Sequence, residues 1–287
     1  MINLSNGHSF EYMAASGALA FGGRGWPWEW PLRWVGLLDP RQFTVVTKTL
    51  TLAPRKGNFR WYNPLACVRF IRDGVVNAVD LTNPGLDWWC RKAGQKVDSQ
   101  KIPLVVSIYA ENIAELAKMC QSLNRFDLIA VKLNLSCPNA AGSCVFDDPG
   151  FVIEFCQAAH RLSRFPIIIK ISVTQAYHSF LPRLENIVEA VAINSVPWDS
   201  IFPGKASPLA RLGGGGVSGK AAQRFTWSAV NNIARKIKIP VIGPSVWEFE
   251  DLDKLRQLGA SAISFGSIFF RPWLPNRLVR QDRRRKV

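Results

Sequence analysis

The sequence predicts an α/β protein folded as a (β/α)8 TIM barrel. Short apolar segments alternate along the 287-residue chain with amphipathic segments whose apolar residues recur at the helical period. The apolar segments are continuous runs, which is typical of parallel strands covered by helices. Eight of them, with intervening helices, span roughly 260 residues, close to the ~250 that such a barrel needs. An open doubly wound sheet is the alternative arrangement.

The eight predicted strands follow one another from the N-terminal region to residue 266. They are Met13–Ser16, Phe43–Lys48, Leu104–Ile108, Leu128–Asn134, Pro166–Ile171, Val191–Asn194, Pro240–Gly243 and Ala262–Gly266. The predicted helices between them are Asn112–Ser122, Gly150–Arg161, Pro182–Ala190, Lys220–Lys236 and Glu248–Leu258. No repeat or linker interrupts the pattern, so residues 1–272 are expected to form one domain, followed by a basic tail at 273–287.

The composition excludes two classes of protein. With 48% hydrophobic and 20% charged residues, the chain is neither a disordered protein nor a coiled coil. Its net charge is +15, of which +6 lies in residues 271–287. This excess favours an anionic partner, whether nucleic acid, a membrane surface or a phosphorylated ligand. The basic tail is expected to be a solvated, mobile end, because chain termini are often loosely ordered.

The N-terminus and the cysteines bear on location. The first ten residues, MINLSNGHSF, have neither a basic start nor an apolar run, so no signal peptide is expected. No apolar stretch reaches the ~18–20 residues of a membrane-spanning helix. The six cysteines include no CxxC pair and the three histidines are scattered, so no structural zinc site is expected. The thiols are therefore expected to be reduced, in a cytoplasmic protein.

Polar or glycine residues follow the predicted strands at the ends where barrel enzymes place their active sites. In chain order these residues are Ser16, Gly17, Lys48, Asn134, Lys170, Asn194, Ser195, Gly243, Gly266 and Ser267. Lys48 and Lys170 each end an apolar run directly, in VVTK and IIIK. One such lysine is commonly a solvated rim residue, but two at equivalent places favour a convergent site.

Glycine-rich turns in the second half of the chain predict an anion site. Phosphate groups in barrels commonly bind in the loops after strands 7 and 8, on backbone N–H groups and a helix N-terminus. Those loops begin here at Gly243 and Gly266, and a third turn, 213–219, precedes a predicted helix. Glycines also serve ordinary tight turns, so each of them alone is weak evidence.

Cys137 is a candidate for proton transfer. It lies in LNLSCPN, just beyond a strand end, where Pro138 stiffens the turn. Most free cysteines are small buried hydrophobic residues, and no histidine nearby in the sequence would activate this one for acyl transfer. A general base needs only reach and a suitable pKa, which neighbouring lysines lower.

Together these segments resemble the dihydroorotate dehydrogenases, which are FMN-dependent (β/α)8 barrels of pyrimidine biosynthesis. The most specific matches are TKTLTLAPRKGN (47–58), GVVNAVDLTNPG (74–85) and LNLSCPN (133–139). Weaker matches follow in the expected order: IIIKIS (167–172), INS (193–195), GGGVSG (214–219), PVIG (240–243) and FGS (265–267). Cys137 indicates the soluble, cysteine-base branch, since the membrane-associated branch has serine at this place.

The resemblance implies a mechanism and a set of site residues. Cys137 would remove the C5 proton of dihydroorotate while hydride passes from C6 to flavin N5, with Lys48 beside the reacting centre. Lys170 would lie near the flavin pyrimidine edge, where a cation stabilises the anionic reduced ring. The implied substrate-binding residues are Asn77, Asn134, Asn139, Asn194 and Ser195. The implied cofactor-binding residues are Ser16, Gly17, Lys48, Asn134, Lys170, Gly219, Gly243, Gly266 and Ser267.

Three departures from the family pattern bear on FMN binding. The family usually has Gly-Gly after strand 7, whereas this chain has Pro244-Ser245-Val246. Pro244 offers no N–H, and the two following side chains would crowd a phosphate. Asp80 replaces a usual glycine, and the segment SIYAENIAEL after strand 3 is several residues shorter than usual.

Two alternative functions remain open. A flavin barrel like the tRNA dihydrouridine synthases also carries a cysteine in an N-x-x-C-P turn, and the +15 charge would suit an RNA backbone. No RNA-binding helical domain follows the barrel, however, so nucleic acid is not expected as a partner. The other alternative is a degenerate, non-catalytic barrel that serves as a binding subunit, for which the altered loop is the support.

The expected partners include one surface that the resemblance does not explain. Residues 25–34, GWPWEWPLRW, hold four tryptophans. Such a loop forms a packed lid or oligomer contact, or it docks, together with the basic tail, on a membrane surface. The expected partners are thus dihydroorotate and orotate, a second copy in a homodimer, an electron acceptor and, through Trp26–Trp34, a membrane surface. Fumarate, a quinone or a redox partner subunit all occur as acceptors among relatives.

Overall fold

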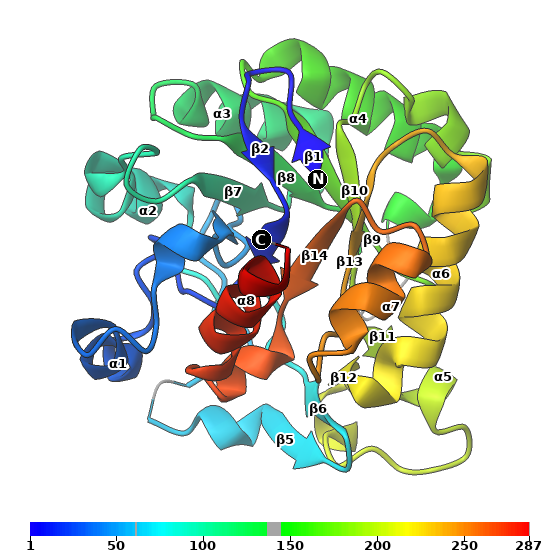
Figure 1. Cartoon of the computed structure of the whole chain (residues 1–287). Coiled ribbons are helices and arrows are strands. Elements are labelled where there is room, and N and C mark those ends of the chain that lie inside the picture. The colour runs from blue at the N-terminus through cyan, green and yellow to red at the C-terminus, as the bar shows by residue number, and fades with distance from the viewer. Residues whose placement is uncertain (61, 137–144, 287) are drawn as a thin grey trace.

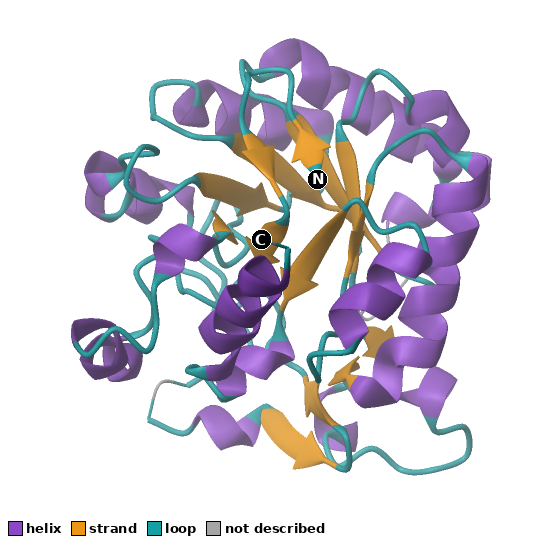
Figure 2. Cartoon of the chain, in the orientation of Figure 1, coloured by secondary structure: helices purple, strands orange, loops and turns teal. Residues whose placement is uncertain are grey.

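Eight parallel strands close into a barrel at the centre of the molecule (Figures 1 and 2). The computed structural model describes residues 1–60, 62–136 and 145–286. The barrel strands are β3 (Tyr12–Ala14), β4 (Thr44–Val46), β7 (Leu104–Ile108), β8 (Ala130–Asn134), β9 (Ile167–Ile171), β10 (Ala190–Ile193), β13 (Val241–Gly243) and β14 (Ala262–Phe265). Barrel strands adjacent in the chain pair in parallel, and β14 pairs with β3 to close the ring. All eight predicted strands are confirmed, and the open doubly wound sheet is excluded.

Helices cover the outside of the barrel (Figure 2). Four predicted helices are confirmed as α3 (Ile113–Leu123), α4 (Pro149–Leu162), α6 (Gln223–Lys236) and α7 (Asp251–Gln257). Asn112 and Asp148 accept hydrogen bonds from N–H groups in the first turns of α3 and α4, which fixes where these helices begin. Four further helices are α1 (Trp30–Trp34), α2 (Leu86–Lys92), α5 (Trp198–Ile201) and α8 (Leu274–Arg285).

The predicted helix Pro182–Ala190 is wrong. Two short 3-10 turns, Tyr177–Ser179 and Leu181–Leu184, form the connection between β9 and β10 instead. Asn186 then adopts a φ of +68°, a left-handed conformation that ends a helical turn. The apolar spacing that indicates a helix here reflects burial of Leu181 and Leu184 in these turns.

A small antiparallel sheet, which we call the cap sheet, lies over one end of the barrel (Figure 1). Its strand order is β11 (Val196–Pro197), β12 (Gly216–Gly219), β6 (Gly74–Asn77) and β5 (Val68–Ile71). The cap strands leave the carboxyl ends of β4 and β10, so the cap sheet lies at the end where barrel enzymes bind ligands. The opposite end is covered by the hairpin of β1 (Ile2–Asn3) and β2 (Ser9–Phe10).

The barrel interior changes character along its axis. Near the hairpin it is filled by an apolar cluster that includes Ile2, Phe10, Met13, Ile168 and Ile242. Towards the cap sheet, the buried residues on the inner faces of β7 and β8 are polar: Ser107, Lys132 and Asn134. We call the carboxyl ends of the eight strands the barrel mouth, and it is there that polar side chains gather.

The expectation of a solvated, mobile tail is wrong for most of the segment. Residues Leu274–Arg285 form α8, which packs on the barrel and buries Leu278, Val279 and Asp282. The Asp282 carboxylate accepts hydrogen bonds from Tyr12 on β3 and from Arg256 on α7. Ion pairs of Asp282 with Arg256, of Arg285 with Asp253 and of Lys286 with Glu11 join this basic segment to α7 and to the segment before β3, so it is anchored rather than a free end. Among the helices of the described ranges, none combines the length and apolarity needed to span a bilayer.

Candidate functional site

The barrel mouth brings together the polar residues at the ends of β8, β9 and β10. Asn134 pairs in register with Lys170 across β8 and β9, so both side chains lie on the inner face. The Lys170 ammonium donates to the Asn194 Oδ1 atom at 3.3 Å, and the Ser195 hydroxyl reaches the same oxygen at 3.5 Å. Ser136 donates to the Asn134 amide oxygen at 3.0 Å. The predicted site residues thus form one polar cluster at the mouth, which contains Asn134, Lys170, Asn194 and Ser195.

Lys48 stands across the mouth from this cluster. It follows β4 beside Gly17, where a Cβ atom on the glycine would lie 3.6 Å from the lysine side chain. Burial, together with a smaller contribution from the charge of Lys170, lowers the pKa of Lys48 to about 8, while Cys67 and Asp80 act in the opposite direction. Lys48 after β4 and Lys170 on β9 thus both lie at the carboxyl ends of their strands.

A row of hydroxyl groups lines the mouth between β3 and β7. The Ser16 Oγ atom donates to the Thr47 carbonyl at 2.8 Å and lies 3.1 Å from the Thr49 Oγ1 atom. Thr49 in turn lies 2.9 Å from the buried Ser107 hydroxyl. Ser16 is therefore part of the mouth together with Thr49, the residue that follows Lys48 at the predicted strand end, while Ser107 is a polar residue that the sequence analysis does not assign to the site.

Asn77 belongs to the cap sheet rather than to the strand-end cluster. It ends β6, pairs in register with Gly216, and its amide donates to the Gly216 carbonyl at 3.3 Å. Asp80, which stands where the resemblance has a glycine, adopts a φ of +52° and pairs with Arg55 at 3.0 Å. The left-handed conformation explains why glycine suits this position.

The four predicted glycine and serine residues of the anion site have different surroundings. A Cβ atom on Gly243 would collide with Leu255 and Ala260 at 2.8 and 2.9 Å, so this glycine allows α7 to pack closely on the barrel. Gly219 adopts a φ of +94° beneath Trp247, whose ring atoms lie 2.9 Å from its missing Cβ. Gly266 and Ser267 begin the short turn Ser267–Phe270 after β14.

The loop after β13 is tied to the neighbouring helices. The Trp247 and Glu248 N–H groups both donate to the Asp251 carboxylate, at 2.8 and 2.9 Å. Ser245 has a φ of +67°, and its carbonyl accepts a hydrogen bond from Gln223 at 3.0 Å. With Pro244 lacking an N–H, three of the five residues 244–248 have no free backbone N–H to offer an anion.

Two predicted site residues, Cys137 and Asn139, lie outside the described residues. The chain before them is fixed, because the Leu135 N–H donates to the Lys170 carbonyl at 2.9 Å and the Leu135 side chain is buried. Leu135, the residue after β8, thus lies directly beside Lys170.

One further residue of the mouth is missed by the sequence analysis. Lys132 is 2% exposed and lies two positions before Asn134, on the same inner face of β8. Burial, followed by the charge of Lys170, lowers the pKa of Lys132 to about 7. The signal in the sequence is a lysine inside the apolar run LIAVKLNL, where charged residues are rarely left unpaired.

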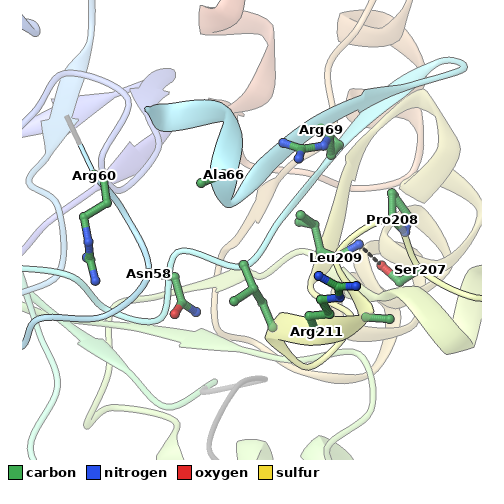
Figure 3. Close-up of a pocket in the computed structure, with 10 residues that line it drawn as sticks. Asn58, Arg60, Ala66, Arg69, Ser207, Pro208, Leu209 and Arg211 are labelled. Atoms are coloured by element: carbon green, nitrogen blue, oxygen red, sulfur yellow. Dashed lines mark hydrogen bonds between the residues drawn. The ribbon is translucent and has the colours of Figure 1, made fainter. Parts of the chain in front are cut away.

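One cavity lies outside the mouth, beside the cap sheet (Figure 3). Its volume is about 680 Å³, and its lining includes Asn58, Arg60, Arg69, Ser207 and Arg211. The Arg60 guanidinium donates to the carbonyls of Lys56, Gly57 and Phe59, which shows that it stabilises its own turn. The cavity lies beside the cap sheet, whereas the predicted site residues gather at the barrel mouth.

Known proteins match this chain over most of its length. The dihydroorotate dehydrogenase family model matches residues 36–281. The catalytic subunit of dihydroorotate dehydrogenase B (NAD(+)) from Caldicellulosiruptor bescii is 30% identical over 268 residues, which cover 90% of this chain and 83% of that protein. Its counterpart from Pyrococcus furiosus is 31% identical over 232 residues, 79% of this chain and 75% of that one. A ligand-free DHODH structure from Eimeria tenella shares the fold, with a TM-score of 0.72 over 97% of this chain and 84% of that one, at 16% identity.

Proposed function

The chain belongs to the dihydroorotate dehydrogenase family, and from this membership we propose that it oxidises dihydroorotate to orotate with FMN as its cofactor. It is a flavin-dependent oxidoreductase with a TIM barrel, in a family of pyrimidine biosynthesis. The observation that carries the proposal is the meeting of Lys48 and Lys170 with the amides of Asn134 and Asn194 at the barrel mouth. Amines and amides together suit a carboxylated pyrimidine, which presents N–H and C=O groups beside a negative charge.

The residues of the mouth fit the ring system of a flavin better than its phosphate. The Asn134 and Asn194 amides and the Lys170 ammonium supply donors and acceptors for a heteroaromatic ring. At the phosphate end, Pro244 has no N–H and Asp251 already engages the N–H groups of Trp247 and Glu248. Donors for a phosphate are available in the turn that begins at Gly266 and Ser267, which is the start of a 3-10 helix.

The proposed mechanism assigns one task to each residue of the mouth. When bound, FMN would supply the hydride acceptor for the substrate C6 hydrogen. Cys137, as the general base, would take the C5 proton. Lys170 would hold positive charge beside the ring, and Asn134 and Asn194 would orient the substrate ring. Lys48 would lie beside the reacting atoms, with Ser16 and Gly17 shaping the wall next to it.

The proposal makes a spectroscopic prediction. The purified protein should be yellow, and its flavin bands should bleach anaerobically on addition of dihydroorotate. Cys137→Ala should slow the bleaching by about 10²-fold or more, which is the range for loss of a general base. Cys90→Ala, which alters a buried thiol on α2, serves as the matched control and should leave the rate unchanged.

Two outcomes would contradict the proposal in different ways. A colourless protein that cannot be reconstituted with FMN would favour the non-catalytic barrel, whose support is the donor-poor loop after β13. If the protein is yellow but its Cys137→Ala variant bleaches at the wild-type rate, the proposed activity stands and Cys137 is not its general base. No observation favours an RNA-modifying barrel, and we do not propose one.

We propose partners from the same membership. Relatives are named as catalytic subunits of an NAD(+)-type enzyme, so an electron-accepting subunit is the partner that we infer for this chain, which we also expect to form a homodimer. The tryptophan loop supports a membrane contact: Trp28, Trp30 and Trp34 are exposed, and Arg280 of α8 donates to the Gly36 carbonyl beside them at 2.9 Å. A cytoplasmic location stays a prediction.

A further inference from the structure

Lys132 is an interior lysine that the proposed mechanism does not use. Its side chain starts on β8 and its ammonium lies 4.0 Å from the Met13 sulfur on β3. Strands β3 and β8 are three positions apart in the ring of eight. The side chain therefore crosses the inside of the barrel, and its charge lies within the barrel rather than at its wall.

Among the described residues, none gives Lys132 a compensating negative charge. Its register partners on β7 and β9 are Ser107 and Ile168, and the Met13 partners on β14 and β4 are Ser264 and Thr44. The charged group that faces it is Lys170, one residue pair nearer the mouth on β9. Within the described chain, no carboxylate lies within ion-pair distance of Lys132, and a thioether is a weak acceptor for an ammonium.

A buried amine in such surroundings is stable in its neutral form unless an anion approaches. Removing an ammonium from water without an opposite charge is costly, so burial and Lys170 together disfavour protonation. A carboxylate bound among Lys48, Lys170 and the mouth amides would lie on the same axis and would favour protonation. The hydroxyl row Ser16–Thr49–Ser107 runs from the half-buried Ser16 to the register partner of Lys132 on β7.

We propose that the buried Lys132 amine takes up a proton from solvent when a carboxylated ligand enters the barrel mouth. The resulting ammonium then stabilises the bound carboxylate. For each ligand carboxylate that binds, the lone pair of the Lys132 amine binds one proton. The barrel interior thereby acquires a cation only when there is an anion for it to stabilise. This inference rests on the proposed function, because the ligand that it requires is orotate or dihydroorotate.

Calorimetry with orotate tests the inference without measuring turnover. Titrating the FMN-loaded protein at pH 8 in two buffers of different ionisation enthalpy gives the number of protons taken up per orotate bound. Lys48 also lies at the mouth and would contribute to the wild-type total. The contribution of Lys132 is therefore the difference between wild type and Lys132→Met, which we expect to be about half a proton or more at this pH.

Affinity supplies a second readout, and two variants separate charge from packing. Lys132→Met should weaken orotate binding by about tenfold at pH 7, because one attractive charge is lost. Lys132→Arg keeps a permanent charge, so it should bind orotate nearly as tightly as wild type while showing the low proton uptake of Lys132→Met. Lys92→Met, at an exposed site on α2, is the matched control and should change neither quantity.

The outcomes separate this inference from the function on which it rests. Equal proton uptake in wild type and Lys132→Met, with orotate bound by both, overturns the role of Lys132 and leaves the proposed function intact. Absence of orotate binding to the wild type overturns the proposed function and this inference with it. If Lys132→Met fails to fold, Lys132→Gln repeats the comparison with a neutral side chain that keeps a hydrogen-bonding group.

Discussion

At the scale of single residues, burial shifts the pKa values of both basic and acidic side chains towards the neutral form. Burial lowers the pKa values of Lys48 and Lys132, and an anion bound nearby would favour their charged forms. Glu29, in the tryptophan loop, has its pKa raised to about 7 by burial, although it accepts a hydrogen bond from the Trp26 N–H at 2.7 Å. Gly25, with a φ of +84°, gives the carboxylate the space that a side chain would fill.

Replacing Glu29 with Gln should stabilise the protein at neutral pH and above. The folded-state pKa lies above the unfolded value, so the folded chain binds more protons and loses stability as the pH rises from about 4.5 to about 7. Above that window, Glu29→Gln should raise the free energy of unfolding by up to about 3 kcal/mol. Denaturant unfolding at pH 5 and pH 8 measures the difference.

The pH dependence is what distinguishes this effect from a general gain in packing. Asp87→Asn, at an exposed site paired with Arg91, removes the same charge and should change stability little at either pH. A gain for Glu29→Gln that is equal at pH 5 and pH 8 would contradict the assignment of the charge to Glu29.

At the scale of elements, α8 shows how a basic segment becomes part of the fold. Burial raises the pKa of Asp282, but the hydrogen bonds from Arg256 and Tyr12 outweigh that effect and lower it to about 2. Arg256 also pairs with Glu11 at 2.9 Å and with Asp253 at 3.1 Å, so the ionic contacts join α7, α8 and the segment before β3. The helix is anchored through one buried carboxylate.

Asp282→Asn should release this anchor. Because the folded-state pKa lies below the unfolded value, the ionised carboxylate contributes stability above about pH 4, and this contribution is lost as the pH falls towards 2. At pH 7 the substitution should cost about 3 kcal/mol, since it leaves the Arg256 guanidinium without its buried partner. Thermal unfolding measures the loss, and limited proteolysis should cut α8 first.

Asp253→Asn is the matched control for this prediction. Asp253 pairs with Arg285 and Arg256 but is 40% exposed, so its loss should cost under about 1 kcal/mol. Equal destabilisation by the two substitutions would show that α8 is held by its surface charges rather than by Asp282.

At the scale of the whole molecule, one apolar surface stands apart from the barrel and its mouth. Trp34 is 79% exposed and Val35 is 69% exposed, next to the arginines of α8. Trp26 differs from its neighbours, because its indole donates to the Gly17 carbonyl at 3.0 Å and stacks on Trp28. Gly17 therefore contacts Trp26 of this surface on one side and Lys48 of the mouth on the other.

The proposed membrane contact predicts binding to anionic lipid vesicles. Wild-type protein should float with vesicles that contain an anionic lipid and be released by salt, because tryptophans favour the headgroup region and arginines attract anionic lipid. A Trp28→Ser, Trp30→Ser, Trp34→Ser triple variant should stay unbound, while Trp26 is left in place to keep the loop packed. Phe70→Ser, at an exposed aromatic residue of the cap sheet, is the control. Wild-type protein that does not float would leave the loop as a contact between protein surfaces.

The sequence by itself determines the barrel and the order of its strands. The barrel strands are largely apolar on both faces, since one face packs on helices and the other on the interior, and so they stand out as nearly continuous apolar runs. The strand ends are equally visible, because Lys48 and Asn134 interrupt the apolar run at the point where it meets solvent or ligand. The cap strands are only two to four residues long, too short to carry a pattern of their own.

The tertiary structure decides which of these residues meet. The contact between Lys170 and Asn194, the separate place of Asn77 in the cap sheet and the packing of Gly243 on α7 all depend on ring closure and on the direction of each side chain. Lys132 shows this most plainly: in the sequence it interrupts a strand, and in the fold it crosses the barrel to Met13. The periodicity of a strand sets the face on which a residue lies, but only the closed barrel sets what that residue faces.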